Sequence, residues 1–301
     1  MSRASLTSFE ASYENLLAEL FELDIDSTKT DVPTGAILAS RLLAGKPSHT
    51  THWLRAVPVY LVPDRDKLLL HQMEKAADFP EECFSRRIAD ELLGIFDDLF
   101  AEILIDDMSG WLFALKQPAR ITTSSINEVS GKNIEHFLPA GQQASQWIAV
   151  FNEIQMILHA ADSTEYGFNA LWFEGVGSLP EISSIKKLGT IGNENLFQAM
   201  AEYSRAEHHD DLSDIRGWAE GLERLIISDM NLLEAINEKS EEKLQQAIRA
   251  ADIQFSQILS LLDEGRLSQV QFYAVNGSRY SISKAGMLSF LQRRKKLPDL
   301  F

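Results

Sequence analysis

Two periodicities alternate along this chain and predict interleaved helices and strands. Apolar residues three or four positions apart predict helices at 8–25, 34–44, 80–103, 142–159, 195–203, 240–262 and 284–294. Short apolar and β-branched runs predict strands at 57–61, 68–71, 111–115, 119–123, 170–174, 187–191, 225–228, 270–275 and 279–282. Because the two kinds of element interleave over the whole length, we expect an α/β fold with a layered mixed sheet flanked by helices.

Turn signals separate these elements without marking a clear domain boundary. The segment 63–66 (Pro-Asp-Arg-Asp) lies between two predicted strands, and Gly265 is placed to cap the helix 240–262. Asn276-Gly277 lies between the last two predicted strands and is a strong hairpin signal. We therefore predict a single domain over 1–301; a sub-boundary, if there is one, falls near 180–186, after Pro180.

Charge and composition exclude several classes of protein. The net charge of −16 disfavours nucleic-acid binding, which depends on clustered Lys and Arg. No apolar run approaches the roughly 18 residues of a membrane span, and the first residues lack the apolar region of a signal peptide. We therefore expect a cytoplasmic protein that contacts no membrane. The basic run 293–296 fits either a solvated helix end or a site for an anion or partner. The single cysteine, Cys83, is predicted to be a small buried hydrophobe.

One helix carries a polar stripe that is a candidate binding surface. In the helix 142–159, Asn152, Gln155 and His159 are spaced i, i+3, i+7, which places them on one face. Two amides and an imidazole in a row have the chemistry to bind a polar ligand. The alternative is that they bind the following loop or face water.

The next predicted strand is aromatic and ends in a Gly-x-Gly turn. Trp172 lies within it, and Gly175 and Gly177 form the turn. Two glycines after a strand suit phosphate binding only when a helix follows, and here Leu179-Pro180 follows. A tight turn that requires small residues is the simpler interpretation.

The remaining catalytic and metal signals are weak. His208-His209-Asp210-Asp211 is a candidate metal cluster, but adjacent residues point in different directions and no spaced ligand motif accompanies them. A solvated acidic loop is the simpler interpretation of these four residues. The chain contains neither a G-x-S-x-G nucleophile motif nor a P-loop.

Taken together, these residues resemble the RpfE-type regulatory-protein family of proteobacteria, which is linked with cofactor-independent phosphoglycerate mutase. The resemblance covers most of the chain and is most specific at its centre. The matching segments are 53–63, 111–115, Gly131, 138–141, 152–159 (Asn-Glu-Ile-Gln-Met-Ile-Leu-His), 169–172, 177–180 and the basic tail at 293–298. The family pattern continues after the histidine with His-Pro-Val-Asn and an arginine, whereas this chain has Ala160 to Tyr166. Its glycine-rich turn is also interrupted here, by Glu174 and Val176.

The resemblance implies a regulatory or binding protein without catalysis of its own and without a cofactor. The residues expected to bind a protein partner or a small polar ligand are Asn152, Gln155, His159, Asn169, Trp172 and Gly177. The rival hypothesis is a metal-dependent, phosphoglycerate mutase-related phosphotransfer enzyme, with His208, His209, Asp210 and Asp211 as metal ligands. Mutases of that type resemble one another in an early Asp-Gly motif, which this chain lacks. We therefore expect at most a degenerate phosphoglycerate-mutase or alkaline-phosphatase-like architecture. A third hypothesis is a purely structural subunit.

Overall fold

The chain divides into two compact units in a computed structural model. The structure describes residues 7–8, 12–25, 31–43, 49–73, 82–106, 110–161, 163–182, 185–210, 221–237, 240–273 and 278–283. Unit 1 comprises 1–13, 189–193 and 209–301, and unit 2 comprises 14–188 and 194–208. The prediction of a single domain with a sub-boundary near 180–186 stays a prediction.

A five-stranded antiparallel sheet is the centre of unit 2, and its longest strand, β3 (His52–Asp64), organises the others. Strand β7 (Ala170–Gly177) runs along one edge of β3. Strands β6 (Gly110–Leu115) and β4 (Lys67–Gln72) pair with successive stretches of the other edge, and β5 (Phe100–Asp106) pairs with β6. Four residues of β3 are therefore paired on both sides: Trp53, Arg55, Ala56 and Val59.

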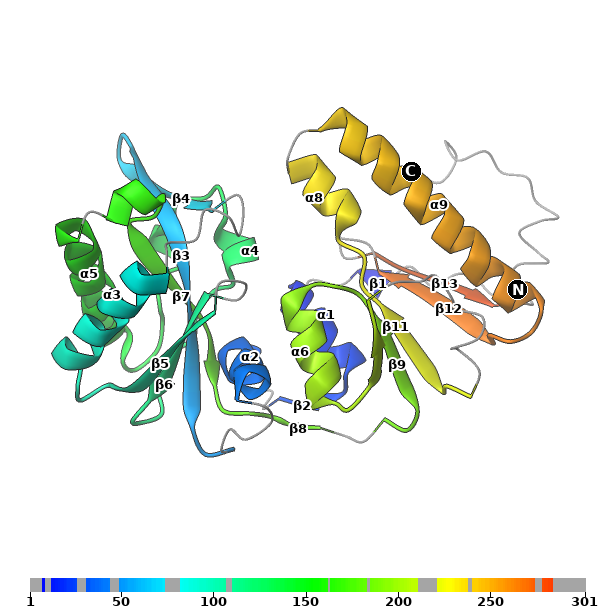
Figure 1. Cartoon of the computed structure of the whole chain (residues 1–301), viewed down its shortest axis with the longest axis horizontal. Coiled ribbons are helices and arrows are strands. Elements are labelled where there is room, and N and C mark those ends of the chain that lie inside the picture. The colour runs from blue at the N-terminus through cyan, green and yellow to red at the C-terminus, as the bar shows by residue number, and fades with distance from the viewer. Residues whose placement is uncertain are drawn as a thin grey trace. The chain divides into compact units, whose positions relative to one another are not determined.

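Helices cover both faces of this sheet. On one face, α3 (Glu82–Ile95) and α5 (Ala144–Ala160) bury their apolar sides in a shared core with the strands (Figure 1). On the other face lies α2 (Thr34–Leu42), which packs in turn against α6 (Asn195–Tyr203). The rings of Phe21, just after α1 (Tyr13–Leu20), and Phe197 of α6 meet edge to face. Because both faces are covered, β6 and β7 are buried at every position and read as continuous apolar runs rather than as alternating ones.

Short elements complete unit 2. They are α4 (Ile126–Val129), the single-turn 3-10 helices η2 (Ile134–His136) and η3 (Ser163–Tyr166), and the paired two-residue strands β2 (Leu23–Asp24) and β8 (Glu181–Ile182). The three-residue strand β10 (Glu207–His209) ends at the boundary between the units.

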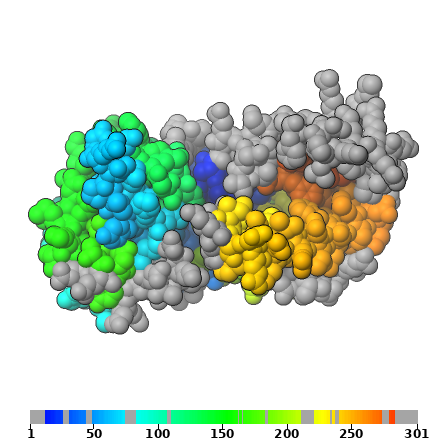
Figure 2. Space-filling view, turned by 90° about the horizontal axis from the view of Figure 1, so that it is seen from above, coloured from blue at the N-terminus to red at the C-terminus, as the bar shows by residue number. Residues whose placement is uncertain are grey.

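Unit 1 contains a long helix and two small sheets. Strands β1 (Thr7–Ser8), β13 (Ser278–Ser283) and β12 (Gln269–Tyr273) form one sheet, and β9 (Leu188–Ile191) and β11 (Arg224–Ile227) are neighbours in the other. Helix α9 (Glu241–Asp263) begins at Ser240, whose hydroxyl accepts a hydrogen bond from the Lys243 N–H. Figure 2 shows α8 (Asn231–Asn237) and α9 at the surface, coloured yellow to orange.

The α/β class predicted from the sequence is confirmed, and most element bounds agree within a few residues. The helix predicted at 80–103 is too long: α3 ends at Ile95, and the β-branched run that follows forms β5 against β6. No strand forms at 119–123, where only Thr122 makes an isolated bridge to Ala140. Cys83 lies on α3 but is exposed, not buried.

Other expectations fall outside the described residues or are met only in part. The turn at Asn276-Gly277, the helix at 284–294 and the basic run 293–296 lie outside the described residues. The strands β12 and β13 on either side of that turn pair antiparallel, as the hairpin signal predicts. Within the described parts of the chain, no helix is both long and apolar enough to cross a membrane.

Candidate functional site

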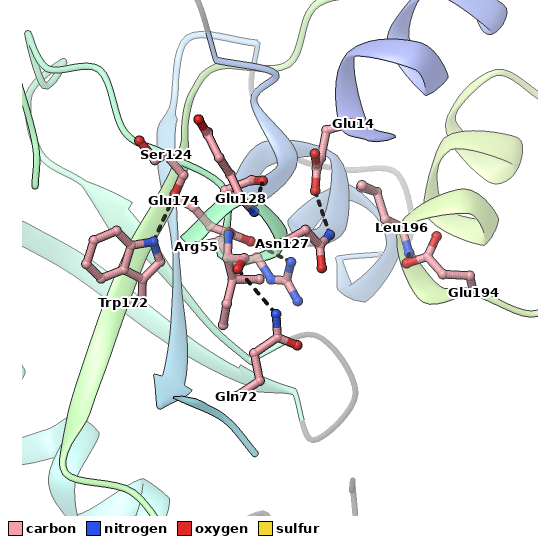
Figure 3. A network of polar contacts seen from close by, with 12 residues as sticks. Glu14, Arg55, Gln72, Ser124, Asn127, Glu128, Trp172, Glu174, Glu194 and Leu196 are labelled. Carbon is pink, nitrogen blue, oxygen red and sulfur yellow. Dashed lines mark hydrogen bonds and ion pairs between the residues drawn. The ribbon is translucent and has the colours of Figure 1, made fainter. Parts of the chain in front are cut away.

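Side chains from four distant parts of the chain converge on the segment 123–127, which includes the first two residues of α4. Figure 3 shows those of Glu14, Gln72, Trp172 and Glu174. Both the backbone N–H and the hydroxyl of Thr123 donate to Asp31. The Trp172 indole N–H donates to the Ser124 carbonyl at 2.8 Å. The remaining contacts are Ile126 N–H to Glu174, Gln72 Nε2 to the Ile126 carbonyl at 3.2 Å, and Asn127 Nδ2 to Glu14 at 3.0 Å. The irregular residues 123–125 and the start of α4 are thereby fixed by specific polar contacts, as buried backbone groups require.

The pair Arg55–Glu174 is the electrostatic centre of this network. The two residues are direct cross-strand partners on β3 and β7, and Arg55 Nη1 lies 2.7 Å from Glu174 Oε1. Their side chains are 19% and 4% exposed, so the ion pair is largely withdrawn from water. The second carboxylate oxygen of Glu174 accepts the N–H of Ile126, the first residue of α4. A buried carboxylate with two donors satisfies the usual condition for burying a charge.

Burial raises the pKa of Glu174 above its ordinary value of 4.5. The charge of Arg55 and the N–H of Ile126 act against this rise, whereas the negative charge of Glu14 adds to it. Glu14 and Glu174 are therefore close enough to repel each other.

This raised pKa predicts a definite pH dependence of stability. A carboxyl whose folded pKa exceeds its unfolded pKa contributes stability that is fully present below the unfolded value and is lost as pH rises through the folded value. We expect the stability advantage of the wild type over Glu174→Gln to be fully present at and below pH 4.5 and to shrink as pH rises above that value. Urea unfolding of both proteins at a series of pH values measures this difference. A difference that grows with pH would mean that the charge of Arg55 outweighs desolvation.

The Gly-x-Gly turn serves close packing against the start of α2. A Cβ atom on Gly175 would lie 1.8 Å from the Thr34 hydroxyl, and one on Gly177 would lie 2.9 Å from the Pro33 ring. Gly175 and Gly177 have φ of +60° and +155°. The turn therefore requires small residues because the N-terminus of α2 lies directly against it.

Two buried oxygens beside this network make no hydrogen bond. Thr34 is 3% exposed and its hydroxyl has no partner among the described residues, and the same holds for Oε2 of Glu14, which is 7% exposed. Buried polar groups nearly always have partners, so each exception requires an explanation.

The predicted binding residues separate into two groups. Asn152 and His159 lie on the exposed side of α5, with Gln155 half-buried between them. The second group takes part in packing: Trp172 and Gly177 belong to β7, and Asn169 directly precedes it. The Asn169 amide is bonded to both the N–H (2.7 Å) and the carbonyl (3.0 Å) of Leu61, and Trp172 is 1% exposed. The binding role of all six residues stays a prediction.

The candidate metal cluster is placed differently from the loop that we expected. His208 and His209 lie on strand β10, Asp210 follows it, and Asp211 is outside the described residues. Neighbouring strand residues point to opposite sides. Within the part of the chain that the structure describes, no group of three His, Cys, Asp or Glu side chains could hold a metal ion.

The sequence signals only part of the polar network. Arg55 and Glu174 are single charges inside otherwise apolar runs, Trp53–Leu61 and Ala170–Val176. A charge inside a buried strand is costly unless it is paired, so each one predicts a partner without naming it. Glu14, on an amphipathic helix, gives no such signal.

Comparison with known proteins adds little. No family model matches the chain, and no curated protein matches it. Among solved structures, the chain is similar to the cofactor-independent phosphoglycerate mutase from Thermoplasma acidophilum DSM 1728, with a TM-score of 0.36 and 12% identity. The similarity spans 94% of this chain and 80% of the mutase chain. Similarity at this level does not place the two proteins in one family.

Proposed function

We propose that this chain is an RpfE-type protein that acts by binding another protein, without catalysis of its own, through the outer face of α5. The observation that carries this proposal is that Met156, which lies between Asn152 and His159 on α5, is 65% exposed. These three residues are spaced i, i+4, i+7 and so form one stripe along the helix. A flexible thioether flanked by an amide and an imidazole combines adaptable apolar contact with hydrogen bonding.

The opposite side of α5 supports this proposal because it fixes the helix firmly. The rings of Trp147 and Phe173 meet edge to face at 5.7 Å, and those of Phe151 and Trp172 do so at 6.0 Å. Aromatic pairs of this geometry contribute about 0.5–1.5 kcal/mol beyond the area that they bury. A surface held rigid before binding loses less conformational entropy when a partner docks. Trp172, which is buried, and Asn169, which is half-buried, would then serve the site by positioning α5 and β7.

Site-specific photocrosslinking tests the proposed surface. A photoreactive benzoylphenylalanine at position 156 of the full-length chain should give a discrete crosslinked partner in the cells that produce the protein. The same group at Ile95, a residue that is 48% exposed at the end of α3, is the matched control and should not give that product. Combining Asn152→Ala with His159→Ala should abolish the product at 156, while unfolding free energy changes by no more than about 0.5 kcal/mol. The same product at both positions, or its persistence in the double variant, would contradict the proposal.

Thermal melting separates this proposal from the phosphotransfer hypothesis. A ligand that binds only the native state stabilises it by about 2.7 kcal/mol at a hundredfold excess over its Kd. We expect no change in Tm with Mn²⁺, Zn²⁺, EDTA or 3-phosphoglycerate. A metal-dependent rise in Tm that 3-phosphoglycerate enlarges would favour the enzyme instead. The cytoplasmic location expected from the sequence stays a prediction.

A further inference from the structure

Glu14 is the most unusual charged residue of unit 2. It lies in the first turn of α1 and is 7% exposed. One of its oxygens accepts a hydrogen bond from Asn127 Nδ2 at 3.0 Å, and the other, Oε2, has no partner among the residues that the structure describes. Figure 3 shows its carboxylate directed from α1 toward Asn127. A buried carboxylate oxygen without a donor costs free energy that the fold must supply from elsewhere.

The surrounding charges make this cost larger. Arg55 already bonds Glu174, and the charge of Glu14 acts on Glu174 with the opposite sign to that of Arg55. The cation of Arg55 therefore lies near two carboxylates, those of Glu174 and Glu14. In the contacts described, Arg55 bonds Glu174, and Glu14 is the residue with an oxygen that has no donor. An added positive group at Glu14 would both satisfy the oxygen and relieve the repulsion.

We propose that Glu14 and Asn127 form a binding site for an organic cation that carries N–H donors, such as an alkylammonium or guanidinium group. Glu14 Oε2 supplies a charged acceptor, and the amide oxygen of Asn127 supplies a neutral one beside it. Asn127 is exposed whereas Glu14 Oε2 is buried, so a ligand reaches that oxygen only when the Asn127 side chain moves aside. This site is separate from the α5 surface, and neither proposal depends on the other.

Both charge and N–H donors are required by this chemistry. A compact ammonium group placed against a poorly hydrated carboxylate gains a charge-assisted hydrogen bond, which is stronger than a hydrogen bond between neutral groups. A quaternary ammonium has the charge but no donor, and a neutral amide has the donor but no charge. The two groups therefore serve as probes of the two requirements.

Titration of the full-length protein with ethylammonium chloride, followed by NMR at the Asn127 side-chain amide, tests the site. We expect a saturable shift with ethylammonium, and none with tetramethylammonium chloride or acetamide at the same concentration and ionic strength. Glu14→Gln keeps an oxygen for Asn127 but removes the charge, and it should weaken binding at least tenfold. Glu128→Gln is the matched control, because it removes one exposed carboxylate next to Asn127 and should leave affinity unchanged.

Several outcomes would overturn the proposal. These are a shift that does not saturate, an equal response to tetramethylammonium, or equal affinity in the wild type and Glu14→Gln. Because Glu14→Gln removes a buried charge with an open oxygen, we expect its Tm without ligand to equal or exceed that of the wild type. If this variant does not fold, Glu14→Asp provides the test, because it keeps the charge but withdraws the carboxylate by one methylene. Unchanged affinity in Glu14→Asp would exclude Glu14 as the residue that binds the cation.

Discussion

Glu174→Ala should be among the most destabilising single substitutions in this chain, with a cost of about 3–5 kcal/mol in the free energy of unfolding. The substitution leaves the guanidinium of Arg55, 19% exposed, without the carboxylate that it bonds at 2.7 Å. It also leaves the Ile126 N–H without its acceptor, which loosens the start of α4. Urea unfolding at neutral pH measures the cost as a fall in the transition midpoint with an unchanged m-value.

The exposed ion pair of the same unit provides the control. Arg41 Nε lies 3.2 Å from Glu202 Oε1, and these side chains are 32% and 52% exposed. Solvent screens such a pair, so Glu202→Ala should cost no more than about 1 kcal/mol. Similar costs for Glu174→Ala and Glu202→Ala would show that burial of the Arg55 pair does not matter. Replacing both Arg55 and Glu174 by apolar residues should cost less than Glu174→Ala alone, because the guanidinium of Arg55 then no longer loses its carboxylate partner.

Elements whose apolar pattern is long and regular could be predicted from the sequence. The face formed by Trp147, Phe151, Ile154 and Leu158 predicts a helix that the structure places at Ala144–Ala160. The helix predicted at 195–203 agrees with α6 at both ends. Ile103 continues the spacing of Leu92 and Leu99, and this pattern predicts, wrongly, that it belongs to the preceding helix. The turn at 96–99 and the pairing of β5 with β6 override that local pattern.

The polar network could be predicted only in part, because its contacts join residues far apart in the chain. The Arg55–Glu174 bond spans 119 residues, and the Asn127–Glu14 bond spans 113. Local pattern marks Arg55 and Glu174 as charges in apolar strands, but the partner of each depends on the register between β3 and β7. The stripe of Asn152, Gln155 and His159 can be predicted from helical spacing alone. Its separation from Asn169, Trp172 and Gly177 depends on how α5 and β7 pack.

Gly175→Ala should cost clearly more than a glycine in a left-handed turn usually does. The left-handed backbone alone penalises an L-residue by about 1–2 kcal/mol. Gly175 has φ of +60°, and an added Cβ would also lie 1.8 Å from the Thr34 hydroxyl and 3.0 Å from the Thr34 backbone nitrogen. Displacing the start of α2 should add about 1–3 kcal/mol, the usual cost of overpacking. The total is measured as the loss in free energy of unfolding by urea.

Two further variants divide this cost into its backbone and packing parts. Gly131 has φ of +74° and nothing within 4 Å of an added Cβ, so Gly131→Ala should show the backbone penalty alone. Thr34→Ala removes the nearest clashing atom, a hydroxyl without a partner, and should restore part of the stability of Gly175→Ala in a double-mutant cycle. Equal losses for Gly131→Ala and Gly175→Ala, with no recovery from Thr34→Ala, would mean that the turn needs glycine only for its backbone angle. A larger loss for Gly175→Ala, partly recovered by Thr34→Ala, would instead show that glycine is needed because β7 packs against α2. The need for Gly175 would then come from Thr34, which lies 141 positions earlier in the chain.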